Sequence, residues 1–458
     1  MLEYTYKEIE RAVRGRLLVP TRRAHFKGGI SIDTRTLAPG DMFVALRGRN
    51  FDGHAFIDEA FERGARLCLA EESSQRRIRR KDPDIIYVDD AVQALGRLGA
   101  FHRRNKKIPV IAVTGSCGKT TTKELIAHLL SDRLRVLKSE GSENNQIGVP
   151  KTLLKIDDHD VVVLELGTNQ LGEIRYLTRL ADPTHAVVTM IGNSHLMGFR
   201  SIQGVKREKM SMIDGLSDGA CVIYNADDRN IQHPRLKKLK SVRVGFSKRY
   251  DVYAERIHLM QDGSVFLLNG KHKVVSPILG RHNILNTLLA AGCAKVFKIP
   301  SKRVSELVTG FSPTPGRVRY REVRGIHWID DSYNANPSSL KAAIELFKSY
   351  PPKGRKILAL GDMLELGPRA TAFHRDAGKS IAGYSFDLVC LIGKLSKRFA
   401  DEARASGFDP KKIREFPSSF EAGNFIKSKL KPGDTVLLKG SRGMHMERIM
   451  EACGIPTA

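Results

Sequence analysis

Short apolar runs alternate along the chain with segments whose apolar residues recur at helical spacing. Seven runs have the length and the valine, isoleucine and leucine content of buried strands: 108–113, 161–166, 186–191, 221–224, 357–360, 388–392 and 435–438. The segment from Lys119 to Leu130 predicts a helix, because its leucine and isoleucine residues fall on one helical face. Apolar strands separated by helices indicate parallel sheets covered on both faces, so the pattern predicts an α/β protein.

Length and two polar stretches predict a division into three domains. The chain has 458 residues, and roughly 150 residues make one domain. The basic stretch from His102 to Lys107 precedes the strand at 108 and is interpreted as a linker. The stretch Ser312–Gly316 (SPTPG) follows a helix-like run, Ile284–Val296, and is interpreted as a second linker. The predicted domains are 1–106, 107–311 and 312–458.

The charge is strongly positive, with a formal value of +26. This balance favours anionic partners and leaves nucleic acid, membrane surfaces and phosphorylated small molecules open. Basic runs at 76–81 and 235–240 motivate the hypothesis of a nucleic-acid-associated NTPase. Aromatic residues make up only 7% and do not interleave with these runs, so a base-stacking platform is not indicated. We therefore predict that nucleic acid is not a partner.

Targeting and cysteine patterns predict an intracellular protein. No apolar run approaches the ~18 to 20 residues of a membrane span, and the first twenty residues lack an apolar signal core. We expect a cytoplasmic protein without membrane insertion. The six cysteines lie far apart with no CxxC pair, which supports neither a disulfide framework nor a structural zinc site.

The segment Val113–Thr122 (VTGSCGKTTT) has the features of a phosphate-binding loop. A predicted strand runs into glycine-bearing residues, and Lys119 and Thr120 then open a helix. Glycines let backbone N–H groups point at phosphate oxygens, and the helix N-terminus adds a partial positive charge. Lys119 would reach the β- and γ-phosphates, and the Thr120 hydroxyl would bind Mg²⁺. The alternative is a strand–turn–helix whose glycines serve only the turn. The predicted nucleotide-binding residues here are Gly115, Ser116, Cys117, Gly118, Lys119, Thr120 and Thr121.

Three further residues are candidates for a metal site. Glu165 ends an apolar run and is well placed for Mg²⁺, although a helix-capping or surface role would also explain it. His195 follows another strand end, but a single histidine is more often structural than a ligand. Lys209 is, by sequence alone, one of many surface lysines.

The last third of the chain carries three polar motifs. Arg317 follows the second linker and could stabilise a transferring phosphate, or it could be an ordinary surface residue. An Asx-rich turn that caps a helix explains part of Asp330–Pro337 (DDSYNANP), but not its density of polar residues. Lys439–Gly443 (KGSRG) follows a strand end and suits a carboxylate or phosphate; a basic turn is the alternative.

The order and spacing of the motifs resemble the Mur ligases, ATP-dependent amide ligases of peptidoglycan precursor synthesis. The motifs are GSCGKTT, NNQIGVP (144–150), ELG with GEI (165–174), GNSHL, GRHNILN (280–286), TPGR, DDSYNANP, LGDMLELG (360–367) and KGSRGMHME (439–447). DDSYNANP, LGDMLELG and KGSRGMHME are the discriminating motifs. The Asp-Asn-Pro-Arg motif of the tripeptide-forming members is absent, and folylpolyglutamate synthases share the phosphate loop but not the C-terminal motifs.

The resemblance implies a fold and a reaction. The fold is α/β with three domains: a smaller N-terminal α/β domain for the uridine nucleotide, a central phosphate-loop domain with a mostly parallel sheet, and a Rossmann-like C-terminal α/β ligase domain. The implied enzyme uses ATP and Mg²⁺ to join D-alanyl-D-alanine to UDP-N-acetylmuramoyl-tripeptide through an acyl phosphate. We expect a monomer whose C-terminal domain closes on ATP. A ligase for another amine, and a scaffold that only binds the precursor, are the alternatives.

The resemblance also assigns roles to residues. It implies catalytic roles for Lys119, His195, Lys209 and Arg317, with Arg317 on the γ-phosphate. It implies Mg²⁺ ligands at Thr120, Glu165, His195 and Lys209, the last carbamylated by CO₂, although Met210 and Ser211 follow it where the family has Gly and Glu. Asn283 and Asp331 would hold the adenosine part of ATP. The expected substrate-binding residues are Ser31, Thr34, Arg35 and Asn50 near the UDP group, and Asn145, Tyr333, Asn334, Asn336, Lys439, Ser441 and Arg442.

Overall fold

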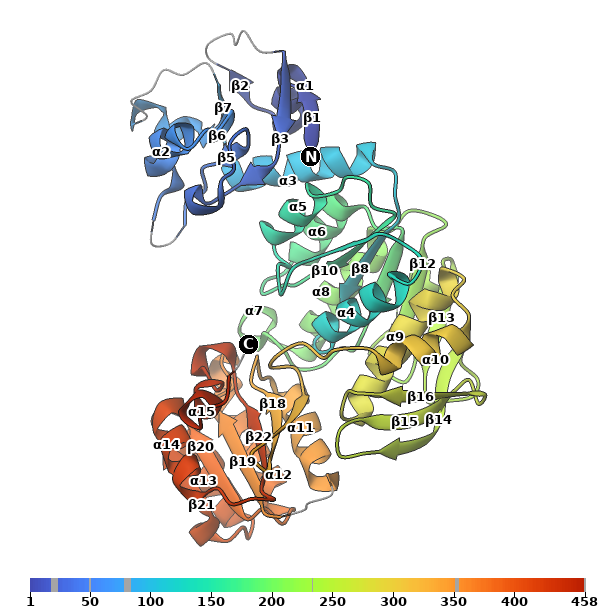
Figure 1. The fold of residues 1–458 in the computed structure, drawn as a ribbon, viewed down its shortest axis with the longest axis vertical. Helices are drawn as coiled ribbons and strands as arrows, with labels where there is room; N and C mark the ends of the chain where they lie inside the picture. The colour runs from blue at the N-terminus through green and yellow to red at the C-terminus, as the bar shows by residue number, and fades with distance from the viewer. Residues whose placement is uncertain (18–23, 49–50, 78–83, 233, 351–353, 457–458) are drawn as a thin grey trace.

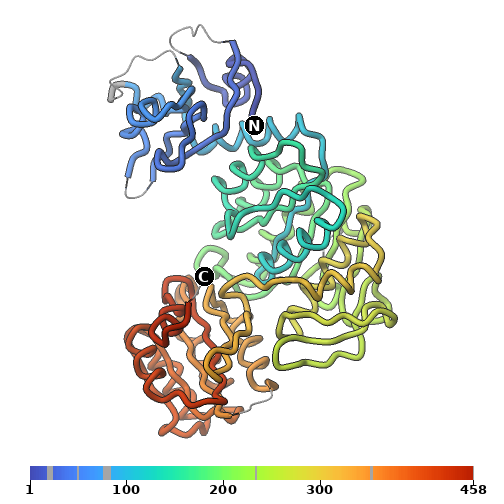
Figure 2. Tube along the Cα trace, in the orientation of Figure 1, coloured from blue at the N-terminus to red at the C-terminus, as the bar shows by residue number. Residues whose placement is uncertain are grey.

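The computed structural model describes residues 1–17, 24–48, 51–77, 84–232, 234–350 and 354–456. The chain forms three α/β lobes that follow one another in sequence order (Figure 1). The trace passes from the first lobe to the second through one helix, and from the second to the third through an extended segment (Figure 2). The predicted α/β class with three domains is confirmed. Among the described residues, no helix has the length and apolar character needed to cross a membrane.

The first lobe contains a small, mostly parallel sheet and a two-stranded ribbon. The sheet order is β2-β7-β6-β5-β4, with β2 antiparallel at one edge, and β1 pairs with β3. Apolar residues of α1, α3 and the sheet form its main core. The elements are β1 (Leu2–Thr5), α1 (Tyr6–Val13), β2 (Arg16–Leu17), β3 (His25–Gly28), β4 (Ile30–Ser31), β5 (Met42–Val44), α2 (Ile57–Glu62), β6 (Leu67–Glu71), β7 (Ile85–Val88) and α3 (Ala91–Asn105).

The junction after this lobe corrects the predicted linker at 102–107. Helix α3 continues through Asn105, so most of the basic stretch is helical. His102 and Arg103 are buried and bond the second lobe: His102 Nε2 lies 2.7 Å from the Ile156 carbonyl, and Arg103 Nε donates to the Ala181 carbonyl at 3.0 Å. These basic side chains therefore belong to a packed junction, a role that a run of charges does not reveal.

The central lobe is built on a nine-stranded sheet in the order β16-β15-β14-β13-β12-β11-β8-β10-β9. The strands from β9 to β14 are parallel, and β15 and β16 continue the sheet as antiparallel strands. The elements are β8 (Val110–Thr114), α4 (Lys119–Leu130), β9 (Val136–Lys138), α5 (Gly148–Leu153), β10 (Val161–Glu165), α6 (Glu173–Ala181), β11 (His185–Val188), α7 (Leu196–Phe199), α8 (Ile202–Asp214), β12 (Cys221–Asn225), β13 (Lys240–Gly245), β14 (Val252–Leu259), β15 (Ser264–Leu268), β16 (His272–Ser276), α9 (Arg281–Val296) and α10 (Ser301–Thr309).

Helices cover both faces of this sheet, as the continuous apolar strands predict. Along β8, Val110 and Ala112 join the core shared with α6 and α8, whereas Ile111 and Val113 join the core shared with α4 and α9. Because β8 lies between β10 and β11, the carboxyl ends of these three strands meet at one edge. This edge is where doubly wound sheets bind ligands.

The third lobe carries a six-stranded sheet in the order β17-β18-β22-β19-β20-β21, parallel except for β17. Its strands β18, β19, β20 and β22 are buried and alternate with helices, as in a Rossmann-like domain. The elements are β17 (Arg319–Val323), β18 (Ile326–Asp331), α11 (Pro337–Ser349), β19 (Lys356–Gly361), α12 (Ala370–Ala382), β20 (Leu388–Ile392), α13 (Ser396–Ala405), β21 (Ile413–Phe416), α14 (Ser419–Lys429), β22 (Thr435–Lys439) and α15 (Arg448–Ala452).

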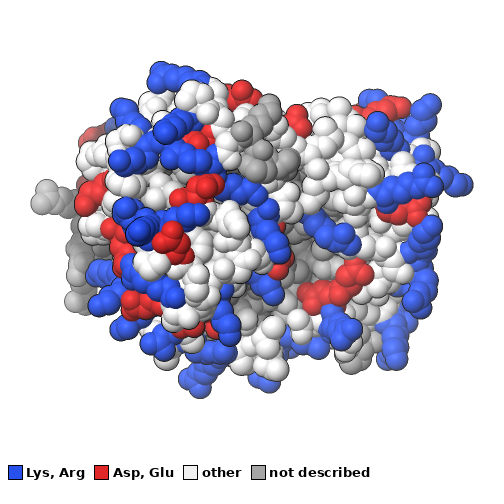
Figure 3. Space-filling view, turned by 90° about the horizontal axis from the view of Figure 1, so that it is seen from below, with Lys and Arg blue, Asp and Glu red and all other residues white. Residues whose placement is uncertain are grey.

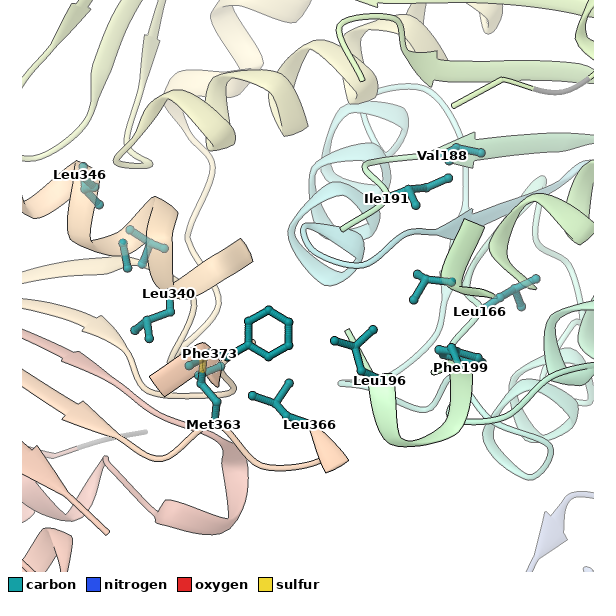
Figure 4. Packing of buried hydrophobic residues seen from close by; sticks show 14 of the residues in the cluster. Leu166, Val188, Ile191, Leu196, Phe199, Leu340, Leu346, Met363, Leu366 and Phe373 are labelled. Atoms are coloured by element: carbon teal, nitrogen blue, oxygen red, sulfur yellow. The ribbon is translucent and has the colours of Figure 1, made fainter. Parts of the chain in front are cut away.

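The second and third lobes pack against each other through apolar side chains. One buried cluster continues from Leu196 and Phe199 in the central lobe to Met363, Leu366 and Phe373 in the third (Figure 4). On the face seen from below, lysine and arginine side chains are spread widely, with acidic side chains between them (Figure 3). The lobes are therefore held by apolar packing, and the basic residues of this face do not form a single block.

Candidate active site

A cavity of about 360 Å³ lies between the central and third lobes. The phosphate loop and the end of β10 contribute one wall, and the start of α9 contributes another. The third lobe supplies Arg317, Asp331 and Lys439. The carboxyl edges of two parallel sheets thus face the same space.

The phosphate loop has the geometry that its sequence predicts. Gly115 and Gly118 have φ values of +151° and +82°, and a Cβ on Gly118 would lie 2.4 Å from Asn286 Oδ1. Ser116 Oγ bonds both the N–H and the carbonyl of Gly192, which ties the loop to the segment after β11. Lys119 Nζ donates to the Gly115 carbonyl at 3.1 Å. These contacts fix the loop against the segment after β11 and against α9.

Glu165 lies against the first turn of α4. Its carboxylate accepts hydrogen bonds from Thr120 Oγ1 and from Asn144 Nδ2, each at 2.8 Å, and only 1% of the residue is exposed. The surface and capping alternatives for Glu165 do not describe this environment. Asn144 is a site residue that the sequence reasoning did not assign, although it begins the NNQIGVP motif.

His195 lines the cavity and forms a hydrogen bond with a residue of the third lobe. Its Nδ1 lies 2.8 Å from Glu365 Oε2, and this hydrogen bond lowers the pKa of Glu365. His195 has φ of +49°, a conformation that non-glycine residues rarely adopt. The side chain is therefore placed by both its backbone and a partner in the other lobe.

Lys209 is a buried residue of α8, contrary to its appearance in the sequence. Only 1% of it is exposed, and its ammonium makes no hydrogen bond within the described part of the chain. Burial, followed by the positive charge of Lys119, lowers the pKa of Lys209 to about 7. Ser211 bonds the Glu208 carbonyl and Met210 is part of the apolar core. Lys209 itself is not among the residues that line the cavity.

Arg317 reaches from the third lobe to the phosphate loop. Its Nη2 donates to Thr120 Oγ1 at 3.2 Å, and its guanidinium lies 3.8 Å from the centre of the Tyr333 ring. Its Nε is buried without a partner among the described residues. Tyr333 in turn donates a hydrogen bond to Ser142 Oγ in the central lobe. The arginine is thus aimed at the position that a nucleotide phosphate would occupy.

The DDSYNANP segment connects β18 to α11 and contacts the phosphate loop. Asn336 caps α11, and its Nδ2 lies 3.3 Å from Cys117 Sγ. Asp331 and Lys439 form a buried ion pair at 2.5 Å, and Lys439 Nζ also donates to the Asn334 carbonyl at 3.0 Å. Burial raises the pKa of Asp331. The side chains of this segment therefore either face the cavity or hold its wall.

The other predicted residues have mixed placements. Asn283 and Asn145 both line the cavity. Asn145 Oδ1 also accepts hydrogen bonds from the N–H groups of residues 147 and 148 at the start of α5. Ser441 Oγ bonds the backbone of 335 and 364, and Arg442 pairs with Glu447 at the surface. Neither Ser441 nor Arg442 lines the cavity.

The residues predicted near the UDP group lie in the first lobe, away from this cavity. Ser31 Oγ donates to the Asp33 carbonyl at 2.8 Å, and Thr34 is buried in the turn that follows. Arg35 is exposed and pairs with Asp33 at 2.6 Å. Asn50 lies outside the described residues. Their role in binding UDP stays a prediction.

Comparison with known families identifies the chain. The Mur ligase middle domain matches residues 113–294, the Mur ligase glutamate ligase domain matches 316–442, and the Mur ligase family catalytic domain matches 28–103. The chain belongs to the Mur ligase family. The motifs from GSCGKTT to GRHNILN fall within the matched middle domain, and DDSYNANP and LGDMLELG fall within the matched glutamate ligase domain.

Full-length relatives share this organisation. The UDP-N-acetylmuramoyl-tripeptide–D-alanyl-D-alanine ligase of Bacillus subtilis (strain 168) is 34% identical over 98% of both chains. The ligase of the same name from Escherichia coli (strain K12) is 34% identical over 92% of this chain and 93% of its own. MurF from Acinetobacter baumannii superposes with a TM-score of 0.87 at 29% identity over 99% of both chains. The MurF ligase of Thermotoga maritima in complex with ADP superposes with a TM-score of 0.82 at 26% identity, over 93% of this chain and 97% of its own.

The donor set of this Mur ligase fits Mg²⁺. Thr120 and Glu165 offer hard oxygen atoms beside the phosphate loop, and Mg²⁺ is commonly bound by one or two carboxylates together with substrate phosphates. Among the described residues, no group of three or more His, Cys, Asp and Glu side chains could hold a metal without further ligands.

Several cavity residues were missed by the sequence reasoning. His282 and Asn286 line the cavity from α9, and Ser338 and Ser339 line it from α11. Burial lowers the pKa of His282 to about 4, so the ring is neutral at pH 7. His282 and Asn286 belong to the GRHNILN motif, which was a usable signal, whereas the serines have no distinctive spacing.

Proposed function

We propose that this protein is an ATP-dependent ligase that joins D-alanyl-D-alanine to UDP-N-acetylmuramoyl-tripeptide through an acyl phosphate. The full-length relatives carry this activity in their names. The observation that carries the chemistry is the approach of Arg317 Nη2 to Thr120 Oγ1 at 3.2 Å. It brings a cation of the third lobe to the nucleotide site of the central lobe.

In the first step, the terminal carboxylate of the tripeptide attacks the γ-phosphorus of ATP. A carboxylate–phosphate bond forms, the bond to the β-phosphate oxygen breaks, and ADP leaves. Two anions must meet, so positive charge has to lie where they meet. Lys119 supplies it from the central lobe and Arg317 from the third lobe, and the buried Nε of Arg317, which has no partner among the described residues, could bond a phosphate oxygen.

Thr120 and Glu165 would hold Mg²⁺, with His195 and a modified Lys209 as further ligands. When bound, the ion would neutralise charge on the phosphate oxygens. The described residues fix the carboxylate of Glu165 before any ligand arrives, through Thr120 and Asn144. The ligand site therefore needs little reorganisation.

We further propose that Lys209 carries a carbamate. Its amine is buried, has no hydrogen-bond partner among the described residues, and is near enough to Glu165 and Lys119 to respond to their charges. The neutral amine would attack CO₂, a nitrogen–carbon bond would form and a proton would be lost. The resulting anion would offer oxygen in place of a cation. A ¹³C resonance after exposure to ¹³CO₂, absent in Lys209→Arg, would support this; its absence in the native protein would contradict it.

In the second step, the free amine of D-alanyl-D-alanine attacks the acyl carbon. A tetrahedral intermediate forms, the carbon–oxygen bond to phosphate breaks, and the amine loses a proton. The peptide bond and inorganic phosphate are the products. Phosphorylation is needed because oxide is too poor a leaving group for a carboxylate to be attacked directly.

The test measures phosphate release from ATP with Mg²⁺, UDP-muramoyl tripeptide and D-alanyl-D-alanine, omitting each in turn. We expect release to require both substrates, with a UDP-muramoyl pentapeptide detected by mass. Release that ignores D-alanyl-D-alanine and responds to another amine would change the substrate within the family. No release in any combination would contradict the proposal.

We also propose that the enzyme works as a monomer in the cytoplasm, where ATP and nucleotide-linked precursors are available. Size-exclusion chromatography with light scattering checks the first point. A mass of twice 51.0 kDa would contradict it. Fractionation of cells that express the tagged chain checks the second.

A further inference from the structure

The segment after β19 crosses to the central lobe at His195. Glu365, in the LGDMLELG motif, places its Oε2 2.8 Å from His195 Nδ1. An ionised carboxylate can only accept a hydrogen bond, so Nδ1 must carry the proton. The other nitrogen, Nε2, has no hydrogen-bond partner within the described residues, and the ring lines the nucleotide cavity.

Contacts that do not involve the Glu365 carboxylate also join this segment to the central lobe. The Met197 N–H donates to the Glu365 carbonyl at 3.2 Å. Leu196 lies opposite Leu366 and Phe373 in the apolar contact between the lobes (Figure 4). The two segments are therefore also joined by a backbone hydrogen bond and apolar side chains that do not involve the Glu365 carboxylate.

The segment that carries Glu365 is itself fixed within the third lobe. The Leu364 N–H donates to Ser441 Oγ at 2.8 Å, and the Met363 N–H donates to His374 Nε2 at 3.0 Å. Asp362 accepts the Leu395 N–H. Glu365 therefore stands on a rigid support, so it reaches His195 only when the third lobe is docked.

The carboxylate adds little to docking by itself. The Glu365 side chain is 56% exposed and that of His195 is 24% exposed, and exposed ion pairs contribute little to stability. What the bond does fix is the tautomer and the orientation of the imidazole. Carboxylates that accept the second N–H of a metal-binding histidine have this effect.

We propose that Glu365 is a positioning residue that aims Nε2 of His195 at the metal–nucleotide site when the third lobe closes. Domain closure and metal ligation are thereby coupled, because the two partners lie on different lobes. The inference rests on the proposed function only in taking His195 as a ligand of Mg²⁺.

The test measures Mn²⁺ binding to the protein–ADP complex by electron paramagnetic resonance, without either substrate. Glu365→Ala should raise the Kd for Mn²⁺ by about 10- to 100-fold. Glu365→Gln should have a smaller effect, since its amide oxygen still accepts the Nδ1 proton. Glu345→Ala, an exposed glutamate on α11 with no side-chain partner in the described structure, is the matched control and should bind Mn²⁺ normally.

Two further readouts separate positioning from structure. ADP affinity without metal should be unchanged in all three variants, and the ¹⁵N shifts of His195 should show the Nδ1–H tautomer in the native protein and a mixture in Glu365→Ala. Normal Mn²⁺ affinity in both Glu365 variants overturns the proposal, as does an equal loss of ADP affinity without metal. If Glu365→Ala fails to fold, the Mn²⁺ affinity of Glu365→Gln and the His195 tautomer in the native protein decide the test. If the Glu365 variants show the expected loss of Mn²⁺ affinity but the native protein has no ligase activity, the result would instead count against the proposed substrates.

Discussion

Replacing Arg317 tests whether the third lobe acts on the transferring phosphate. Arg317 Nη2 is 3.2 Å from Thr120 Oγ1, so a phosphate oxygen beside Thr120 would lie about 4 Å from the guanidinium charge. At an effective dielectric constant of about 20, such a pair contributes about 4 kcal/mol. If that interaction is made mainly in the transition state, its loss corresponds to about 10³-fold in rate. Arginines that act on transferring phosphoryl groups contribute about 10³- to 10⁵-fold, which agrees.

We therefore expect Arg317→Ala to lower kcat by about 10³-fold. Arg317→Lys should also lose activity, because an ammonium lacks the planar group that stacks on Tyr333. Folding stability should fall by only about 1 kcal/mol, the contribution of one cation–π contact.

The assay is single-turnover formation of ADP and acyl phosphate with saturating ATP and UDP-muramoyl tripeptide, followed by thermal unfolding of each variant. Arg324→Ala is the control, since this exposed arginine in the turn between β17 and β18 carries the same charge and makes no side-chain hydrogen bond or ion pair in the described structure. A near-native rate for Arg317→Ala would refute the reasoning, and so would an equal loss in Arg324→Ala.

Three other perturbations give distinct readouts. Lys119→Ala should abolish both phosphate release and ligation, because no other cation reaches the loop from the central lobe within the described cavity wall; a normal ligation rate would contradict the mechanism. At fixed dissolved CO₂, activity should fall as the pH drops below about 7, where the Lys209 amine becomes protonated and cannot attack CO₂, and added CO₂ should restore it; activity independent of CO₂ at every pH would argue against the carbamate. Lys439→Met should lower the unfolding free energy by about 3–5 kcal/mol because Asp331 is left buried without its partner. Urea unfolding should show most of that loss recovered in Lys439→Met/Asp331→Leu, and an additive loss in the double variant would contradict the pairing.

Much of the core fold could be predicted because its signals are local. Each of the seven apolar runs corresponds to a strand, and the predicted helix 119–130 is α4 (Lys119–Leu130) without a shift. The phosphate loop was predictable for the same reason, since a strand, two glycines and a helix start within one short segment. The first lobe was harder, because strands such as β2 and β4 have only two residues and carry no periodicity.

The junction at α3 was mistaken because burial does not follow charge along the sequence. His102 and Arg103 resemble a solvated linker, yet their polar atoms bond carbonyl groups of the central lobe. Lys209 shows the same limit, because nothing in its own helix distinguishes it from surface lysines. Only the resemblance to the Mur ligases singled it out.

The sequence by itself determined seven buried strands, the helix at 119–130, the nucleotide loop and the position of Glu165 at a strand end, because each depends on neighbours in the chain. The tertiary structure decided which distant residues meet. Arg317 reaches Thr120 and Glu365 reaches His195 across 197 and 170 residues of chain, respectively. Such contacts depend on how two sheets present their carboxyl edges to one cavity, and that arrangement is set by packing between lobes, which no local pattern encodes.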